Sequence, residues 1–468
     1  MNTKRNIVIY LSLLVVVLVL SLISTLTTPQ SISLVLFSSM IFGTLFFWRF
    51  RLAFALLSIA ALLIFGLLDL HNLIAFAGLD IILFLIGMMV LVGLLEERHF
   101  FGRLVAFLVG RIGGKAWKLV VALMLLSALF AALVDEVTSI LFMIAITFRI
   151  TERFKINPVP FLIMVVFATN IGSSATVVGN PVGVMIALRG GLTFVDFLRW
   201  ATPIAAVSLL IVVLLSLKLF TPAISRLQVA MDKESKSDLE GKLIQEKSPF
   251  SSDMLICWGL FLGTLVSLVM HSQLEQLLGL GKNSLLVGTS MVAAGVSLLV
   301  HRHGARDIVE RRVDWWSLSF FMLLFSSVGT LQFVGTTEVI AQGFISLVGG
   351  NESLLFFSLA GLTALLSAVL DNVLAVATLI PIIQDLGSAG FTILPLWWIM
   401  LFAGTLGGNL TMIGSTANIV ALGYMERKYH GQPDHIHIGF GQWLRVGIPV
   451  TLATLPLAAL LLYVQLLL

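Results

Sequence analysis

The sequence has little charge and almost no cysteine. Only 11% of its 468 residues are charged, whereas 59% are hydrophobic, and the mean hydropathy is +1.06. This composition excludes a soluble globular protein and predicts an all-α protein that crosses a membrane many times. Because Cys257 is the single cysteine, an intramolecular disulfide is excluded and thiol redox chemistry is not expected.

Motifs for ATP-driven or enzymatic chemistry are also missing. The sequence has no GxxxxGK[ST] loop, which argues against ATP as the driving force. It shows no nucleophile, base and orienting group in a recognisable set and no metal cluster, which argues against an enzyme. The net charge of +4 does not call for a nucleic-acid partner, because the placement of basic residues along the membrane explains it.

Apolar runs of the length that spans a bilayer, about 20 residues, define the predicted topology. We expect 11 crossings, two of which, near 160–188 and 395–424, contain glycine-rich breaks. Two further apolar segments, 119–148 and 353–386, are each interrupted by an acid. The nine uninterrupted spans lie near 7–26, 31–48, 52–68, 80–97, 203–220, 252–270, 283–300, 315–334 and 447–467.

The basic residues support this topology. With the N-terminus in the cytoplasm, all but three of the 28 Lys and Arg residues fall on the cytoplasmic side, the exceptions being Arg189, Arg199 and Lys282. This distribution follows the positive-inside rule and predicts a multi-pass protein of the plasma or inner membrane. It also predicts that the two acid-interrupted segments are re-entrant hairpins that enter from opposite faces of the bilayer.

One unusual pattern occurs twice. LSALFAALVDEVTS (126–139) matches LTALLSAVLDNVLA (362–375), and each apolar run is interrupted by an acid, Asp135 or Asp371. Further along each half, GSSATVVGNPVG (172–183) matches GGNLTMIGSTAN (407–418). An ionisable group in hydrocarbon costs about 2.5 kcal/mol or more and therefore marks a functional site. Paired interruptions in two halves indicate the binding site of a transporter.

This pairing divides the chain into five parts. We expect N-terminal membrane helices over 1–78, a first inverted repeat over 79–225, a cytoplasmic linker over 226–251, connecting helices over 252–312 and a second inverted repeat over 313–468.

Polar residues in the two breaks are the candidates for binding a substrate or ion. They are Asn170, Gly172, Ser173, Thr176, Gly179 and Asn180 in the first break, and Asn409, Thr411, Gly414, Ser415 and Asn418 in the second. Glycine allows the backbone to approach a ligand closely, and unwinding frees carbonyls for cations and a helix N-terminus for anions. Small residues also pack between membrane helices, but packing does not require asparagines beside glycines at matching depth.

The adjacent acids Asp135 and Glu136 repel each other, which favours the binding of a proton by one of them. A proton or sodium role follows, and a purely structural buried acid is the alternative. No cofactor is expected apart from Na+ or H+ as the coupling ion.

The paired motifs resemble those of the ion transporter superfamily. The resemblance rests on LVDEVTS, FATNIGSSATVVGNP, LDNV and GTLGGNLTMIGSTANIVA. They are most similar to the branch with a citrate-transporter-like domain that holds arsenite permeases, D-type sodium-proton antiporters and the P protein. The resemblance implies two re-entrant hairpins, two broken helices and a homodimer in which a transport domain moves against a scaffold.

In those relatives the hairpin tips and broken-helix loops hold sodium and the substrate. The resemblance therefore assigns such roles to Asp135, Glu136, Thr138, Asp371 and Asn372 at the tips, and to Thr176, Gly179, Asn180, Thr411, Gly414, Ser415 and Asn418 in the loops. The chain departs from the family pattern at Glu136 and Gly183, where an asparagine is common.

The sequence predicts a secondary active transporter that works by alternating access and is coupled to an ion. Its substrate is a small inorganic or organic ion: a small anion, an arsenite-like oxyanion, or sodium exchanged for a proton. The alternative is a gated ion channel on the same scaffold, which passive flux would reveal.

Overall fold

The computed structural model describes residues 3–109, 114–233, 254–429 and 438–467, and these residues form helices and no strand. Ten helical segments are long and apolar enough to cross a membrane. Their main helices are α1 (Thr3–Ile23), α2 (Thr28–Phe46), α5 (Leu79–Glu97), α7 (Ala116–Leu133), α12 (Thr202–Leu219), α15 (Leu255–Leu278), α16 (Ser284–His301), α18 (Trp315–Phe333), α20 (Glu352–Leu370) and α24 (Phe440–Leu467). The predicted all-α, multi-pass class is confirmed.

Further helices, most of them shorter, complete the fold. They are α3 (Arg51–Ile64), α4 (Leu70–Phe76), α6 (Phe100–Val109), α8 (Glu136–Arg153), α9 (Val159–Ser173), α10 (Pro181–Gly190), α11 (Phe194–Asp196), α13 (Thr221–Lys233), α17 (Ala305–Arg312), α19 (Thr336–Val348), α21 (Asn372–Ser388), α22 (Leu394–Gly407) and α23 (Thr416–Tyr429). The crossing expected at 52–68 is a helix of only 14 residues, α3. The first residues of the expected linker, 226–233, continue α13, and the rest of that linker lies outside the described residues.

Both acid-interrupted segments form two helices that part at the acid. Helices α7 and α8 meet at Asp135, and α20 and α21 meet at Asp371. The first arms, α7 and α20, have 18 and 19 residues and count among the helices long enough to cross a membrane. They are longer than arms that reach only mid-membrane, and the re-entrant course of these segments stays a prediction.

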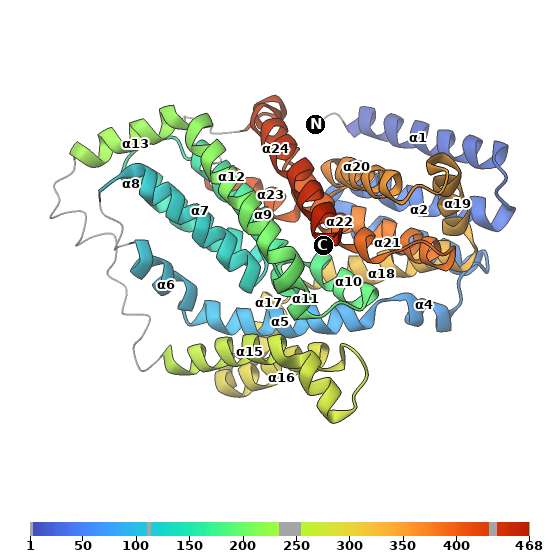
Figure 1. Ribbon diagram of the computed structural model, residues 1–468, viewed down its shortest axis with the longest axis horizontal. Helices are drawn as coiled ribbons and strands as arrows, with labels where there is room; N and C mark the ends of the chain where they lie inside the picture. The colour runs from blue at the N-terminus through green and yellow to red at the C-terminus, as the bar shows by residue number, and fades with distance from the viewer. Residues whose placement is uncertain (1–2, 110–113, 234–253, 430–437, 468) are drawn as a thin grey trace.

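The two halves of the molecule pack in the same way. Each first arm packs on the helix that leads into a break, α7 on α9 and α20 on α22. Each helix that leaves a break packs on the opposite half, α10 on α21 and α23 on α8. Helices α12 and α24 pack on each other across the face seen in Figure 1, where the two hairpins lie toward opposite ends of the molecule.

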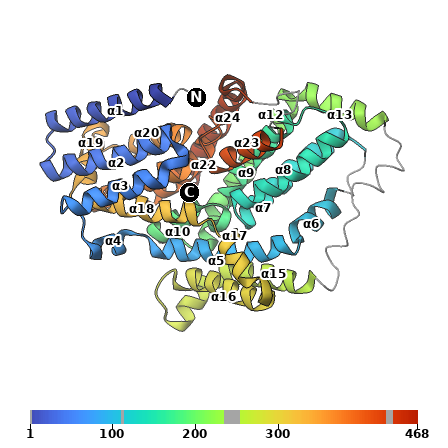
Figure 2. The ribbon, with the colours of Figure 1, turned by 180° about the vertical axis from the view of Figure 1, so that it is seen from behind.

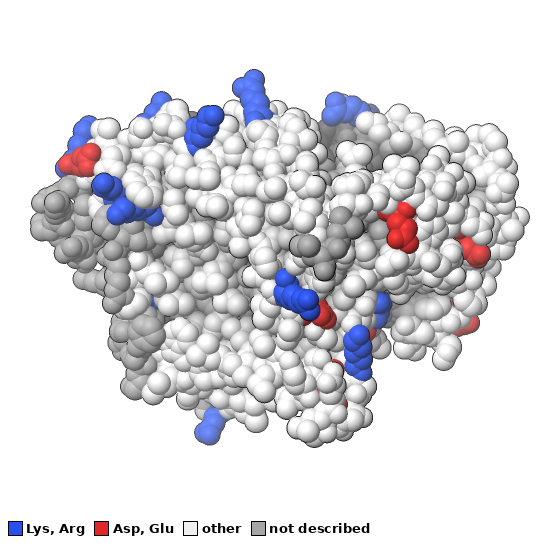
Figure 3. Space-filling view, in the orientation of Figure 1, with Lys and Arg blue, Asp and Glu red and all other residues white. Residues whose placement is uncertain are grey.

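The remaining helices surround this mirrored centre. Helices α2, α3 and α4 pack on α18, as seen from behind in Figure 2, and the α15–α16 pair packs on α5. Figure 3 shows Lys and Arg side chains along the edge formed by α13 and the start of α24, with an acidic side chain among them and both basic and acidic side chains elsewhere on this face. The orientation that the positive-inside rule predicts stays a prediction.

Candidate functional site

The two hairpin tips are bends capped by an aspartate. Each aspartate is the N-cap of the second helix of its hairpin. Oδ1 of Asp135 accepts the backbone N–H groups of Val137 and Thr138 at 2.7 and 2.9 Å. Oδ1 of Asp371 accepts the two equivalent N–H groups of its own hairpin at 2.8 and 3.0 Å. Such a cap stabilises a helix by about 1 kcal/mol, so the repeated acid has a structural role in both halves.

Glu136 lies where the two tips meet. Its side chain is fully buried, and Nδ2 of Asn372 donates to both of its carboxylate oxygens at 3.2 Å. The hydroxyl of Ser173, in the first break, donates to Oε2 of the same carboxylate at 3.3 Å. One carboxylate therefore joins both hairpins and the first broken helix, and the groups that donate to it are neutral.

Asn170 connects the two glycine-rich breaks. Its Nδ2 donates to Oδ1 of Asn409 at 2.8 Å and to Oδ1 of Asn418 at 2.9 Å. Its Oδ1 accepts the hydroxyl of Ser415 at 2.9 Å. All four side chains are buried. Residues that lie far apart in the sequence thus form one amide network at the centre of the molecule.

Asn180 links this region to the hairpin tips and begins the helix after the first break. Its Nδ2 donates at 2.8 Å to the hydroxyl of Ser173, which in turn donates to Glu136. Its Oδ1 accepts the backbone N–H of Gly183 at 2.8 Å and so caps α10. Pro181 follows at the first helical position. Proline lacks a backbone N–H, and at this position an N–H would have no acceptor within the helix.

Threonine hydroxyls tie each break to the hairpin of its own half. Thr176 donates to the carbonyl oxygen of Ala132, and Thr411 donates to the carbonyl oxygen of Ala368. The two alanines occupy matching positions, three residues before each tip aspartate. The same contact forms twice, as expected for two halves with one plan.

Glycines in the breaks permit close backbone contact. A Cβ on Gly172 would overlap the backbone of Ala128 on α7. Each break also folds closely back on itself. A Cβ on Gly179 or Gly414 would meet the backbone of the residue six positions earlier in the same break. These glycines are required by packing, so their presence alone does not indicate a ligand.

Two oxygens at the second tip are buried and have no hydrogen-bond partner among the described residues. They are Oδ2 of Asp371 and Oδ1 of Asn372. With the Glu136 carboxylate, they supply hard oxygen donors of the kind that bind alkali and alkaline-earth cations. The structure thus places Glu136 of the first tip beside Asn372 of the second, while the roles of the tip residues in ion binding stay predictions.

Arg51 is a residue that the sequence did not single out. It was assigned to a cytoplasmic loop, but it is 5% exposed and its Nη2 donates to the hydroxyl of Ser317 on α18 at 2.6 Å. Its guanidinium lies 4.4 Å from the ring centroid of Trp48 and 5.2 Å from that of Phe320. It is the positive charge that acts on Asp371. The aromatic residues close to Arg51 in the sequence could have indicated that its side chain is not simply solvated.

A cavity of about 610 Å³ lies between elements of the two halves. Residues of α5 and α18 line one part of it, and residues of α10 and α21 line another. Arg189 and Asp80 line this cavity and form a two-pronged ion pair, with N–O distances of 2.7 and 2.9 Å. The predicted topology places Arg189 on the side opposite the cytoplasm and does not pair it with an acid.

The chain is similar to known transporters. Residues 41–347 and 287–468 match the family described as citrate transporter. Uncharacterized transporters of Mycobacterium bovis and Mycobacterium tuberculosis are each 32% identical over 394 residues, which cover 82% of this chain and 86% of the relative. The human P protein is 25% identical over 466 residues, which cover 85% of this chain and 54% of that protein.

The fold also has a solved counterpart. A crystal structure of the YdaH transporter of Alcanivorax borkumensis covers 85% of this chain and 86% of its own, with a TM-score of 0.52 and 17% sequence identity. At this identity the likeness concerns the fold alone. The resemblance to the ion transporter superfamily is confirmed, and the chain belongs to the citrate transporter family.

Proposed function

We propose that the protein is a secondary active transporter in which Glu136 carries the coupling ion. The observation that supports this role is the position of one buried carboxylate between both hairpin tips and a broken helix. The contacts of this side chain change whenever the two hairpins and the broken helix move relative to one another. Loading or unloading Glu136 would therefore change the relative stability of two arrangements of the halves.

The chemistry of Glu136 favours a cation. A buried carboxylate without a cationic partner is costly, and the negative charges of Asp371 and Asp135 also act on it. A bound proton removes the charge, and a bound sodium ion neutralises it with help from the unpaired oxygens of Asp371 and Asn372. Either ion makes the closed contact between the tips more stable, which is the physical basis of coupling.

The mirrored packing of the two halves supports alternating access. Helices that leave a break in one half pack on the hairpin of the other half, so the halves can exchange contacts around a shared centre. A cavity of about 610 Å³ has residues of α10 and α21 in its lining, so a movement between these two helices would change its shape. The ion pair of Arg189 with Asp80 joins α10 to α5 beside this cavity.

For the substrate we propose a small anion, with carboxylates as the first class to test. The description of the family names citrate, and the buried guanidinium of Arg51 supplies positive charge close to the tip aspartate. Arsenite-like oxyanions and sodium exchanged for protons remain the other two candidates from the sequence.

Flux measurements on purified full-length protein in liposomes test this proposal. A pH-sensitive dye inside the vesicles would report proton movement after addition of citrate, arsenite or sodium from outside, and isotope uptake would report the substrate. We expect substrate-dependent flux that a sodium or proton gradient drives uphill and that Glu136→Gln removes. Flux that never exceeds the passive gradient would overturn coupled transport and favour the gated channel.

The remaining predictions concern the assembly. We propose that the protein is a homodimer in the plasma or inner membrane, as the family resemblance implies, with the N-terminus in the cytoplasm. Mass measurement of the detergent-solubilised protein, corrected for bound detergent, tests the dimer independently of transport.

A further inference from the structure

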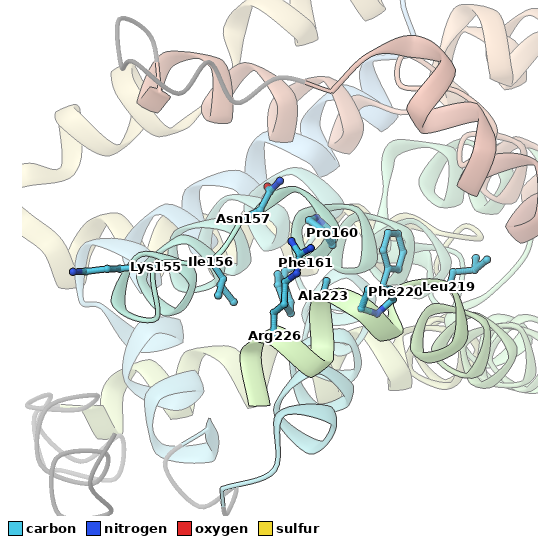
Figure 4. Close-up of a pocket in the computed structure, with 10 residues that line it drawn as sticks. Lys155, Ile156, Asn157, Pro160, Phe161, Leu219, Phe220, Ala223 and Arg226 are labelled. Carbon is cyan, nitrogen blue, oxygen red and sulfur yellow. The ribbon is translucent and has the colours of Figure 1, made fainter. Parts of the chain in front are cut away.

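A second cavity lies away from the polar centre, at the ends of membrane helices. It has a volume of about 370 Å³ and lies between the α8–α9 connection and the turn from α12 to α13. Most of its lining is apolar, including Phe161, Leu219 and Phe220. Figure 4 shows these side chains facing the same space from α9 on one side and from α12 and α13 on the other.

The charged residues that line this cavity are both basic. They are Lys155 and Arg226, and both side chains are exposed. In Figure 4, Arg226 projects from α13 toward the segment of Asn157 and Pro160, while Lys155 lies apart from it and its side chain points away from the other lining residues. No acid is among the lining residues that the structure describes, and these residues present positive charge over an apolar wall.

Acids close in sequence are already engaged elsewhere. Oε1 of Glu152 accepts Lys428 at 2.8 Å and the hydroxyl of Tyr429 at 3.2 Å. Oδ1 of Asp232, on the same helix as Arg226, accepts the side-chain amide of Gln228 at 2.8 Å. Neither carboxylate is therefore placed to neutralise the two basic side chains of the cavity.

The cavity lies where a helical segment long enough to cross a membrane ends. Leu219 is the last residue of the membrane-spanning segment that contains α12, and α13 begins two residues later. Helix α13 buries Ile224 and Leu227 while it exposes Val229, which suits a helix that lies along a membrane surface. Basic side chains at such a surface attract anionic lipid by about 1 kcal/mol each.

We propose that this cavity binds the headgroup of an anionic phospholipid, with the phosphate held by Arg226, the charge of Lys155 adding to the attraction, and the upper acyl chain against Phe161 and Phe220. Charge complementarity explains the phosphate, and the apolar wall explains why the ligand is a lipid. A free phosphate would leave that wall exposed to water. This inference does not depend on which ion the protein transports.

Thermal unfolding of the full-length protein in a neutral detergent tests the proposal. Cys257 is 1% exposed, so a thiol-reactive fluorophore reports its exposure on unfolding without any added label site. We expect phosphatidylglycerol to raise the unfolding temperature of the wild type by about 2 °C or more, since a ligand of the folded state stabilises it. Phosphatidylcholine at the same concentration should leave it unchanged.

The variant Lys155→Gln with Arg226→Gln should lose the response to phosphatidylglycerol. The matched control is Arg306→Gln with Arg311→Gln, which removes the same charge from α17, where both side chains are at least 79% exposed. The control should respond like the wild type. An equal loss in both double variants would show a general charge effect and overturn the site.

Two further experiments distinguish binding of lipid from binding of free phosphate, and they do not rely on the charge variants. Ala223→Phe fills the cavity from α13 without changing charge, and it should lower the number of phosphatidylglycerol molecules retained in native mass spectrometry. Inorganic phosphate and glycerol phosphate should not shift the unfolding temperature. A shift by inorganic phosphate as large as that by the lipid, or full lipid retention in Ala223→Phe, would overturn the proposal.

Discussion

The two hairpin tips share an aspartate and differ in the residue that follows it. Asp135 and Asp371 each accept two backbone N–H groups at 2.7–3.0 Å. The next residue is Glu136 in the first tip and Asn372 in the second, and these two side chains contact each other. The aspartate that both tips share therefore stabilises the bend, while Glu136 and Asn372, which differ between the tips, form the contact between the halves.

The backbone of the two tips differs as well. Asp371 has φ of +103°, in the region that favours glycine, whereas Asp135 has an extended φ of −178°. Asp371 is fully buried and Asp135 is half-buried. A non-glycine residue persists in such a conformation only where its surroundings hold it, often at a functional site. The second tip is thus the more constrained of the two.

Asn372→Asp should have the strongest effect on the contact between the tips. It replaces an amide donor with a carboxylate 3.2 Å from Glu136, and an uncompensated buried charge costs about 3 kcal/mol or more. We expect a marked fall in the unfolding temperature, read from exposure of Cys257. Adding Glu136→Gln to the same chain should recover much of the loss. A double variant no more stable than Asn372→Asp alone would show that the tips do not interact.

Alanine at the matched glycines should destabilise both halves alike. A Cβ on Gly172 or Gly407 would meet the backbone of Ala128 or Ala364, and overpacking of this kind costs about 1–3 kcal/mol. Unfolding temperatures of Gly172→Ala and Gly407→Ala measure the effect. The control is Gly263→Ala on α15, where the added Cβ meets open space. A large loss in one half only would refute the shared packing plan.

Removing the caps should have a smaller effect. Asp135→Ala and Asp371→Ala should each lower the free energy of unfolding by about 1 kcal/mol, the usual value of an N-cap. Asparagine retains an acceptor oxygen and should recover most of that stability at either tip. If Asp371→Asn is as damaging as Asp371→Ala, the negative charge and not the cap is the important feature of the second tip.

The ion pair of Asp80 with Arg189 should contribute least. Its side chains are 40% and 31% exposed, and exposed pairs are worth about 1 kcal/mol or less. It joins α5 to α10 in the first half, whereas α18, the counterpart of α5, carries no charged residue. Asp80→Asn should therefore change stability slightly, and added salt should reduce the difference from the wild type. A large loss that salt does not affect would indicate another role for Asp80.

The repeated motifs were sufficient to predict the pairing of the two halves. Both interruptions of each half appear where the sequence placed them, because acids and glycine-asparagine clusters are rare in apolar spans. Which residues meet could not be predicted. The contact of Asn170 with Asn418, for example, depends on how two broken helices cross, and that packing is set by apolar residues common to every span.

Arg51 illustrates a different limit. Counting basic residues assigns an arginine between two spans to the cytoplasm, and that count does not distinguish a solvated side chain from one held by Ser317 and two aromatic rings. The short length of α3 could not be predicted either, since hydropathy alone does not show that the helix in the third apolar run ends after 14 residues. The homodimer and the bound ion stay predictions.

A comparison of Glu136→Gln with Asp371→Asn in liposomes would decide whether the unmatched carboxylate or the repeated one carries the coupling ion. Glu136→Gln removes the negative charge that would hold a proton or a sodium ion, so uptake in this variant should no longer exceed the passive gradient. Asp371→Asn leaves the Glu136 carboxylate in place and should reduce the gradient-driven uptake less than Glu136→Gln does. Normal coupling in Glu136→Gln together with loss of coupling in Asp371→Asn would contradict this account.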